Sequence, residues 1–288
     1  MEETMYGANT QSGLRGDYRE VRGDFTVDQA REPYGEADQA LWRALYARQA
    51  ALIDDYACEA FARGLAQAGC ADGIPELARV SAALSAASGW RLVAVPGFIP
   101  DAVFFSHLAR RQFPVTVWLR RPDEFDYLVE PDLFHDFFGH VPMLFDPRFG
   151  DCMQRFGEQG LAALDADALP RLARLYWYTV EFGLVESAAG LRAYGAGLLS
   201  SGGELRYAVA DASPQRLRFE AQRCMRTRYR IDTYQKTYFV LPSFDALADT
   251  MQADLEVDIR RLETVADIEA GASIAGDVAC CASPRLAA

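Results

Sequence analysis

The chain has 288 residues, of which 50% are apolar and 24% are charged. A chain of this length buries about 75% of its unfolded surface, so a large core is possible, and disordered, collagen and coiled-coil architectures are excluded. The 29 basic and 41 acidic residues give a formal net charge of −12, which repels nucleic acid and anionic membranes. We therefore expect small-molecule ligands, with neither nucleic acid nor a membrane as a partner.

The first residues, Met-Glu-Glu-Thr-Met, have neither the basic nor the apolar region of a secretory leader. The six cysteines are scattered along the chain and include no C-x-x-C pair. Such cysteines are usually reduced thiols in a reducing compartment. The sequence therefore predicts a cytoplasmic protein.

The N-terminal half begins with a polar stretch. Residues 1–37 contain many glycines and show neither helical nor strand periodicity, so we expect an extended arm. From Asp38 onward, apolar residues recur at intervals of three, four or seven, which predicts helix, and residues 75–88 predict a second helix. Between residues 90 and 120, β-branched and aromatic residues are punctuated by prolines. That pattern predicts short strands or irregular segments.

The C-terminal half returns to helical periodicity over residues 131–145 and 170–199. Residues 229–240 alternate polar with apolar side chains, as in a short strand or hairpin, and residues 247–262 predict a last helix. Residues 266–288 are rich in alanine, glycine and serine. Because this segment has few large apolar residues to hold it to a core, we expect a flexible tail.

No repeat and no change in composition interrupts residues 38–265. The simplest organisation is a single, mainly α domain with a small β component, preceded by the arm of residues 1–37 and followed by the tail of residues 266–288.

Two histidines stand out because they lie five residues apart in an aromatic run. His135 and His140 would be separated by about 140° on a regular α-helix, so they can face one point only if a turn is irregular. Gly139 and Pro142 are residues that permit such a turn. Two titratable rings in an aromatic environment need partners, and a metal ion would serve both. Two hydrogen-bonded core histidines are the alternative.

A metal held by two histidines needs a third ligand, and a carboxylate completes the open facial triad of non-haem iron(II) oxygenases. Glu181 is the best candidate because its helical neighbours Trp177 and Leu184 are apolar. Glu186 is a competitor, and a structural ion pair is possible for either. A zinc hydrolase or a metal-stabilised binding protein could use the same ligands, although the H-E-x-x-H pattern is missing.

Longer strings carry a family resemblance. The run PDLFHDFFGHVP resembles the iron-binding signature of the pterin-dependent aromatic amino acid hydroxylases, and YWYTVEFGL resembles the segment with their glutamate ligand. VPGFIPDAVFFSHLARRQFPVTVWLR, GAGLLSSGGEL and TYQKTYFVLPSF stand in the family's order, so the resemblance covers about residues 38–260. The short form, with Asp-Tyr-Leu ahead of Glu-Pro-Asp, is similar to the bacterial phenylalanine 4-hydroxylases.

The resemblance implies the family's catalytic fold and an iron(II)- and tetrahydropterin-dependent monooxygenase that converts L-phenylalanine and O2 to L-tyrosine, as in phenylalanine catabolism. The pterin would be tetrahydrobiopterin or a bacterial analogue. No catalytic residue beyond the iron centre is expected. Tryptophan or tyrosine hydroxylation is the alternative within the family. The C-terminal segment does not resemble the heptad tetramerisation helix of the animal enzymes, so we expect a monomer.

By position, His135, His140 and Glu181 match the family's iron ligands. Arg120 matches the arginine that binds the substrate carboxylate, a role suited to a guanidinium; without the resemblance, Arg120 beside Arg121 would be interpreted as an exposed pair. Val240 falls where tyrosine-specific members carry an aspartate, so it favours an unhydroxylated ring. The expected substrate-binding residues are Arg120, Tyr127, Leu128, Trp177, Ser200 and Val240.

The resemblance also implies a pterin site. Phe104 matches the phenylalanine that stacks on the pterin ring, and close approach of that ring would leave Gly97 no room for a side chain. The expected cofactor-binding residues are Gly97, Phe98, Ile99, Phe104, Asp136 and Tyr176.

Overall fold

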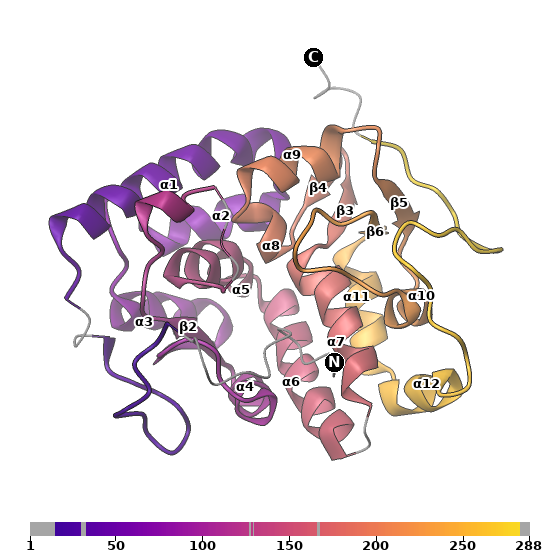
Figure 1. Cartoon of the computed structure of the whole chain (residues 1–288), viewed down its shortest axis with the longest axis horizontal. Coiled ribbons are helices and arrows are strands. Elements are labelled where there is room, and N and C mark those ends of the chain that lie inside the picture. Colours follow the sequence, from indigo (N-terminus) through magenta and orange to yellow (C-terminus); the bar gives the residue numbers. More distant parts are fainter. Residues whose placement is uncertain (1–14, 30–32, 127, 129, 166–167, 283–288) are drawn as a thin grey trace.

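The structure is a computed structural model that describes residues 15–29, 33–126, 128, 130–165 and 168–282. Helices dominate it (Figure 1). None of the described helices is both long enough and apolar enough to span a bilayer. The α-helices are α1 (Glu36–Tyr56), α2 (Glu59–Ala68), α3 (Leu77–Ser88), α4 (Asp101–Ala109), α5 (Val141–Leu144), α6 (Pro147–Asp165), α7 (Leu169–Tyr176), α8 (Ala196–Leu199), α9 (Gly202–Ala210), α10 (Ala221–Arg226), α11 (Phe244–Gln252) and α12 (Leu255–Leu262).

Besides the α-helices, the described structure contains a 3₁₀ turn and two π-helical segments. A short 3₁₀ turn, η2 (Pro122–Glu124), precedes two π-helical segments, η3 (His135–His140) and η4 (Trp177–Glu181). π-helical segments are rare and are often found at functional sites.

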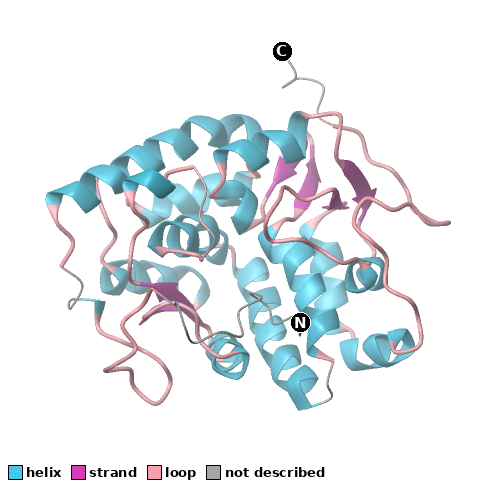
Figure 2. Ribbon diagram, in the orientation of Figure 1, coloured by secondary structure: helices cyan, strands magenta, loops and turns pink. Residues whose placement is uncertain are grey.

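The strands form two small sheets at opposite sides of the molecule (Figure 2). The strands are β1 (Arg91–Val95), β2 (Gln112–Thr116), β3 (Leu184–Ser187), β4 (Gly190–Ala193), β5 (Gln215–Arg218) and β6 (Thr237–Leu241). β1 and β2 pair in parallel, and the larger sheet has the order β4-β3-β6-β5. In that sheet Val240 lies opposite Leu184, close in sequence to Glu181. The predicted fold class, mainly α with a small β component, is confirmed.

The helices predicted before residue 90 are present as α1, α2 and α3. The prediction of strands or irregular structure from residue 90 to 120 is correct for β1 and β2 but wrong for α4. This helix begins after Pro100 and buries Phe104, Phe105 and Leu108. A proline is compatible with a helix start, because the first helical N–H groups have no partner in the helix.

Three further elements differ from the sequence predictions. The helical run predicted over 170–199 is interrupted by the hairpin of β3 and β4. The helix predicted over 247–262 divides into α11 and α12, because Ala253 is extended and the Asp254 carboxylate caps a new helix by accepting a hydrogen bond from the Glu256 N–H. The third difference is α6, which the hydrophobic periodicity did not predict. Both α4 and α11 pack against this helix.

An aromatic core surrounds the first π-helical segment. Phe134 and Phe138 stack with ring centroids 4.9 Å apart, and the Trp42 ring from α1 meets Phe134 edge-on at 5.4 Å. Phe137 also packs edge-on against Trp42, at 5.9 Å. Full burial of each such ring contributes about 2–3 kcal/mol, so η3 is held rigidly between its neighbours.

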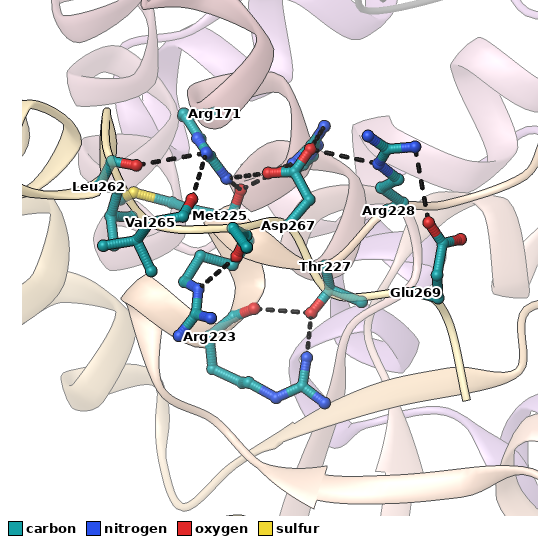
Figure 3. A network of polar contacts seen from close by, with 12 residues as sticks. Arg171, Arg223, Met225, Thr227, Arg228, Leu262, Val265, Asp267 and Glu269 are labelled. Carbon is teal, nitrogen blue, oxygen red and sulfur yellow. Dashed lines mark hydrogen bonds and ion pairs between the residues drawn. The ribbon is translucent and has the colours of Figure 1, made fainter. Parts of the chain in front are cut away.

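Residues 266–288 were expected to form a flexible tail, and the described part of this segment contacts the domain as far as Cys280, whose N–H donates to the Arg216 carbonyl. Asp267 forms ion pairs with Arg171 from α7 and with Arg228 from the segment after α10 (Figure 3). It also pairs with Arg174 from α7. Ile268 is buried and pairs with Thr227. Although the composition of residues 266–288 predicts a flexible tail, ionic and backbone contacts hold Asp267 and Ile268 to the domain.

Burial alone would raise the pKa of Asp267, but hydrogen bonds from Arg174 and attraction by Arg174 and Arg171 outweigh it and lower the pKa from 3.8 to about 2. Its ionised form therefore stabilises the folded state fully above pH 3.8, and this stabilisation is lost as the pH falls toward 2.

Asp267→Asn should lower the free energy of unfolding at pH 7 by about 2–4 kcal/mol, because two largely buried arginines lose their carboxylate. The difference from the wild type should shrink in urea unfolding experiments between pH 5 and pH 3. Glu269→Gln is the matched control: Glu269 is an exposed partner of Arg228, and its loss should change stability by less than about 0.5 kcal/mol. A penalty for Asp267→Asn that is independent of pH would contradict this account.

Candidate metal centre

The irregular turn that the histidine spacing requires is present. His135 and His140 are the first and last residues of η3, and the i→i+5 pattern of a π-helix brings residue i+5 over residue i. Gly139 allows η3 to approach α8, since a Cβ at this position would lie 2.8 Å from the Ala196 carbonyl oxygen. The two rings lie 5.2 Å apart and nearly perpendicular.

Glu181 meets both histidines from the second π-helical segment. Its carboxylate oxygens lie 3.6 Å from His135 Nε2 and 3.2 Å from His140 Nε2. One ligand atom from each residue lies within 4.8 Å of the other two. Glu186 is exposed on β3, away from this cluster. The three side chains predicted as ligands therefore lie close enough together to hold one metal ion.

Ser200 determines which nitrogen of His135 is free. The Ser200 hydroxyl donates its hydrogen to the Ala196 carbonyl at 2.9 Å, so its oxygen accepts from His135 Nδ1, also at 2.9 Å. A neutral imidazole with hydrogen on Nδ1 has its lone pair on Nε2. This nitrogen faces Glu181 and is available for a metal.

The charges of the cluster suit a divalent cation. Burial lowers the pKa of His135 to about 4, so this ring is neutral at pH 7. Burial would raise the pKa of Glu181, but attraction by His140 and then by His135 holds it below its usual value. Glu181 Oε1 is buried and accepts no hydrogen bond in the described structure. Two imidazoles and one carboxylate, one of whose oxygens is unsatisfied, therefore fit a first-row metal ion such as iron or zinc.

Asp132 connects the cluster to Arg120. Both side chains are buried, and Asp132 accepts hydrogen bonds of 2.9 Å from Nε and from Nη2 of Arg120. Asp132 also accepts the backbone N–H of His135 at 3.0 Å. The remaining guanidinium nitrogen, Nη1, donates a long hydrogen bond of 3.4 Å to the Phe125 carbonyl. Arg120 is thus no surface residue, whereas Arg121 is exposed.

Three of the other expected substrate residues, Trp177, Val240 and Leu128, lie within the described structure. The Trp177 ring lies between Tyr229, stacked at 4.2 Å, and Phe182, tilted at 4.7 Å. Val240 is buried on β6, and Leu128 is half-buried. Tyr127 lies outside the described residues.

The expected pterin residues occupy two places. Phe104 and Tyr176 meet edge-on, with centroids 5.9 Å apart. Asp136 accepts the Thr116 N–H at 2.8 Å beside the metal cluster, and burial raises its pKa to about 7.

The loop of Gly97, Phe98 and Ile99 follows β1. Gly97 has φ +149°, and a Cβ there would lie 2.9 Å from the Tyr18 hydroxyl and 3.2 Å from Trp118 Nε1. The protein itself therefore requires glycine at this position, whether or not a cofactor approaches.

Sequence reasoning missed Gln235, whose Oε1 accepts the Trp177 indole N–H at 3.2 Å, and Glu204, which accepts the Gln235 backbone N–H at 2.8 Å. Gln235 lies in a polar stretch with no pattern to distinguish it. Glu204 had one signal, a carboxylate in the first turn of a mainly apolar helix.

Comparison with known proteins gives a consistent assignment. Residues 25–266 match the family model described as biopterin-dependent aromatic amino acid hydroxylase. A phenylalanine-4-hydroxylase from Ralstonia nicotianae is 51% identical over 274 residues, covering 95% of this chain and 87% of the relative. One from Chromobacterium violaceum is 53% identical over 232 residues, covering 80% and 78%. The crystal structure of C. violaceum phenylalanine hydroxylase with bound iron and phenylalanine superposes with a TM-score of 0.86 at 47% identity, covering 93% and 97%.

Glu181→Gln should lower Co(II) affinity by at least about a hundredfold while leaving the circular dichroism spectrum unchanged, because it removes an anionic ligand and keeps the side-chain shape. Equilibrium dialysis with Co(II) measures this without an activity assay. Glu186→Gln, which changes an exposed glutamate five residues away, should bind Co(II) like the wild type. Loss of metal in Glu186→Gln, or retention in Glu181→Gln, would overturn the assignment of ligands.

Proposed function

The chain belongs to the biopterin-dependent aromatic amino acid hydroxylases, and we infer that it converts L-phenylalanine and O2 to L-tyrosine with iron(II) and a tetrahydropterin. The observation that carries this inference is the buried cluster of His135, His140 and Glu181, joined through Asp132 to Arg120. A protein that resembles it along nearly its whole length, from C. violaceum, has been crystallised with iron and phenylalanine.

Iron and tetrahydropterin, when bound, would together activate dioxygen and supply the two electrons that the hydroxylation requires. The protein's part is binding and orientation. Ser200 keeps the His135 proton on Nδ1, so that Nε2 remains a ligand. Three protein ligands leave about three positions free on a six-coordinate ion, which is enough for oxygen and water. No side chain is required as an acid or base for the aromatic ring.

We assign the substrate carboxylate to Arg120. Asp132 occupies Nε and Nη2 of the guanidinium, so Nη1, whose hydrogen bond to Phe125 is the longest, is the nitrogen that a carboxylate would engage. A charge-assisted hydrogen bond of this kind both attracts and orients an amino acid. Trp177 and Val240, both buried, would bound the aromatic ring and exclude water.

We assign the pterin to the surroundings of Phe104 and Tyr176 and of the loop of residues 97–99. Aromatic rings suit a flat bicyclic cofactor, and the Asp136 carboxylate, next to His135 in the sequence, could accept hydrogen bonds from its N–H groups. Tetrahydrobiopterin or a bacterial analogue would fit this chemistry equally.

We further propose that residues 38–265 form the catalytic unit and that the enzyme is a cytoplasmic monomer. All six cysteines are free thiols, which is typical of a reducing compartment. The C-terminal segment packs against its own domain, through Asp267 and Asp277, instead of extending toward another subunit.

Phenylalanine should be preferred over tyrosine by at least roughly tenfold in kcat/KM, because the buried Val240 offers no partner to a phenolic hydroxyl. Tryptophan should be a poorer substrate. Competition among the three amino acids in one vessel, with anaerobically loaded iron, a synthetic tetrahydropterin and then air, measures all three rates together. Preferential hydroxylation of tyrosine or tryptophan would contradict the assigned specificity, and zinc-dependent hydrolysis without a pterin requirement would contradict the function.

A further inference from the structure

The orientation of the Trp177 indole is fixed by more than ring packing. Stacking on Tyr229, at an interplanar angle of 14°, and contact with Phe182 restrict tilting of the ring. Neither contact prevents the indole from sliding within its own plane. The hydrogen bond of 3.2 Å from Nε1 to Gln235 Oε1 adds that restraint.

Gln235 is itself held at every polar group of its side chain. Its Nε2 donates to the Arg230 carbonyl at 2.7 Å and to the Thr233 carbonyl at 3.4 Å, while Oε1 faces the indole. The residue is only 3% exposed. An amide with both ends engaged in a buried site has little rotational freedom.

Glu204 anchors the backbone of Gln235. Its Oε1 accepts the Gln235 backbone N–H and the Tyr238 hydroxyl, both at 2.8 Å. Glu204 follows Ser200, which contacts His135, by four residues, and Tyr238 precedes Val240 by two on β6. Glu204 therefore links its own segment, which contacts His135 through Ser200, to Gln235 and to β6, which carries Val240.

Building on the proposed function, we propose that Gln235, anchored by Glu204, is a positioning residue that sets the plane and depth of the Trp177 indole and so selects the aromatic ring of the substrate. Without the hydrogen bond, the indole can shift within its stack. A mobile Trp177 would hold the phenyl ring of phenylalanine less firmly, and it would discriminate less against the larger side chain of a tryptophan substrate.

Gln235→Leu should raise the KM for L-phenylalanine about tenfold and bring the kcat/KM ratio of tryptophan to phenylalanine at least fivefold closer to one, with an unchanged KM for the tetrahydropterin. The amount of tyrosine formed per tetrahydropterin oxidised should fall. Isothermal titration of L-phenylalanine into Co(II)-loaded protein should show a similar loss of affinity, independent of turnover.

A double-mutant cycle with Trp177→Phe tests whether Gln235 acts through the indole. Trp177→Phe removes the donor and should itself weaken phenylalanine binding and selectivity. In that background Gln235→Leu should add less than a twofold effect. Tyr178→Phe is the matched control, because it removes one hydrogen bond of a neighbouring buried aromatic residue, to the Arg228 carbonyl. Tyr178→Phe should lower the Tm while leaving the phenylalanine KM and selectivity unchanged.

Equal effects of Gln235→Leu with and without Trp177, or parallel rises in the phenylalanine and pterin KM values, would overturn the proposal. If Gln235→Leu does not fold, unaltered phenylalanine affinity and selectivity in Trp177→Phe would overturn it as well. Failure of the wild type to hydroxylate any aromatic amino acid would instead contradict the proposed function.

Discussion

The cost of burying polar groups in an aromatic core governs this structure. His140 and Glu181 are buried and His135 is half-buried, so their ligand atoms have little access to water and need a partner inside the protein or an ion. The hydrogen bond from His135 Nδ1 to Ser200 meets part of this need and leaves Nε2 free. The unsatisfied oxygen of Glu181 is the remaining part, and a cation is the partner that suits it.

The same constraint extends outward through Asp132, which is fully buried. A carboxylate in such a place requires compensation, and Arg120 and the His135 N–H provide it. One buried carboxylate thereby fixes both a metal ligand and the cation expected to bind substrate. Removing Arg120 would leave the charge of Asp132 uncompensated, so the energetics of burial hold Arg120 in place relative to His135.

Patterns local in sequence predicted the metal centre well. The five-residue spacing of the histidines required an irregular turn, and η3 provides it. The apolar neighbours of Glu181 favoured it only modestly over Glu186, which the structure leaves exposed on β3. Features that depend on tertiary contacts were not predictable. α4 follows a proline-containing loop. The contacts of Gln235 with Glu204 and Trp177, and that of Asp267 with Arg171, join residues 31 to 96 positions apart. The composition of residues 266–288 predicted a flexible tail. The ion pairs that Asp267 forms with distant arginines could not be predicted, because such pairs leave no periodic signal in the sequence.

The central claim is that three side chains bind one iron ion beside Arg120. Iron-edge anomalous diffraction from crystals grown anaerobically with Fe(II) and L-phenylalanine tests it most directly. The account predicts a single peak about 2.0–2.3 Å from His135 Nε2, His140 Nε2 and a Glu181 oxygen, with the substrate carboxylate at Arg120 Nη1. An iron peak elsewhere, coordination of iron through His135 Nδ1, or a carboxylate bound away from Arg120 would contradict it.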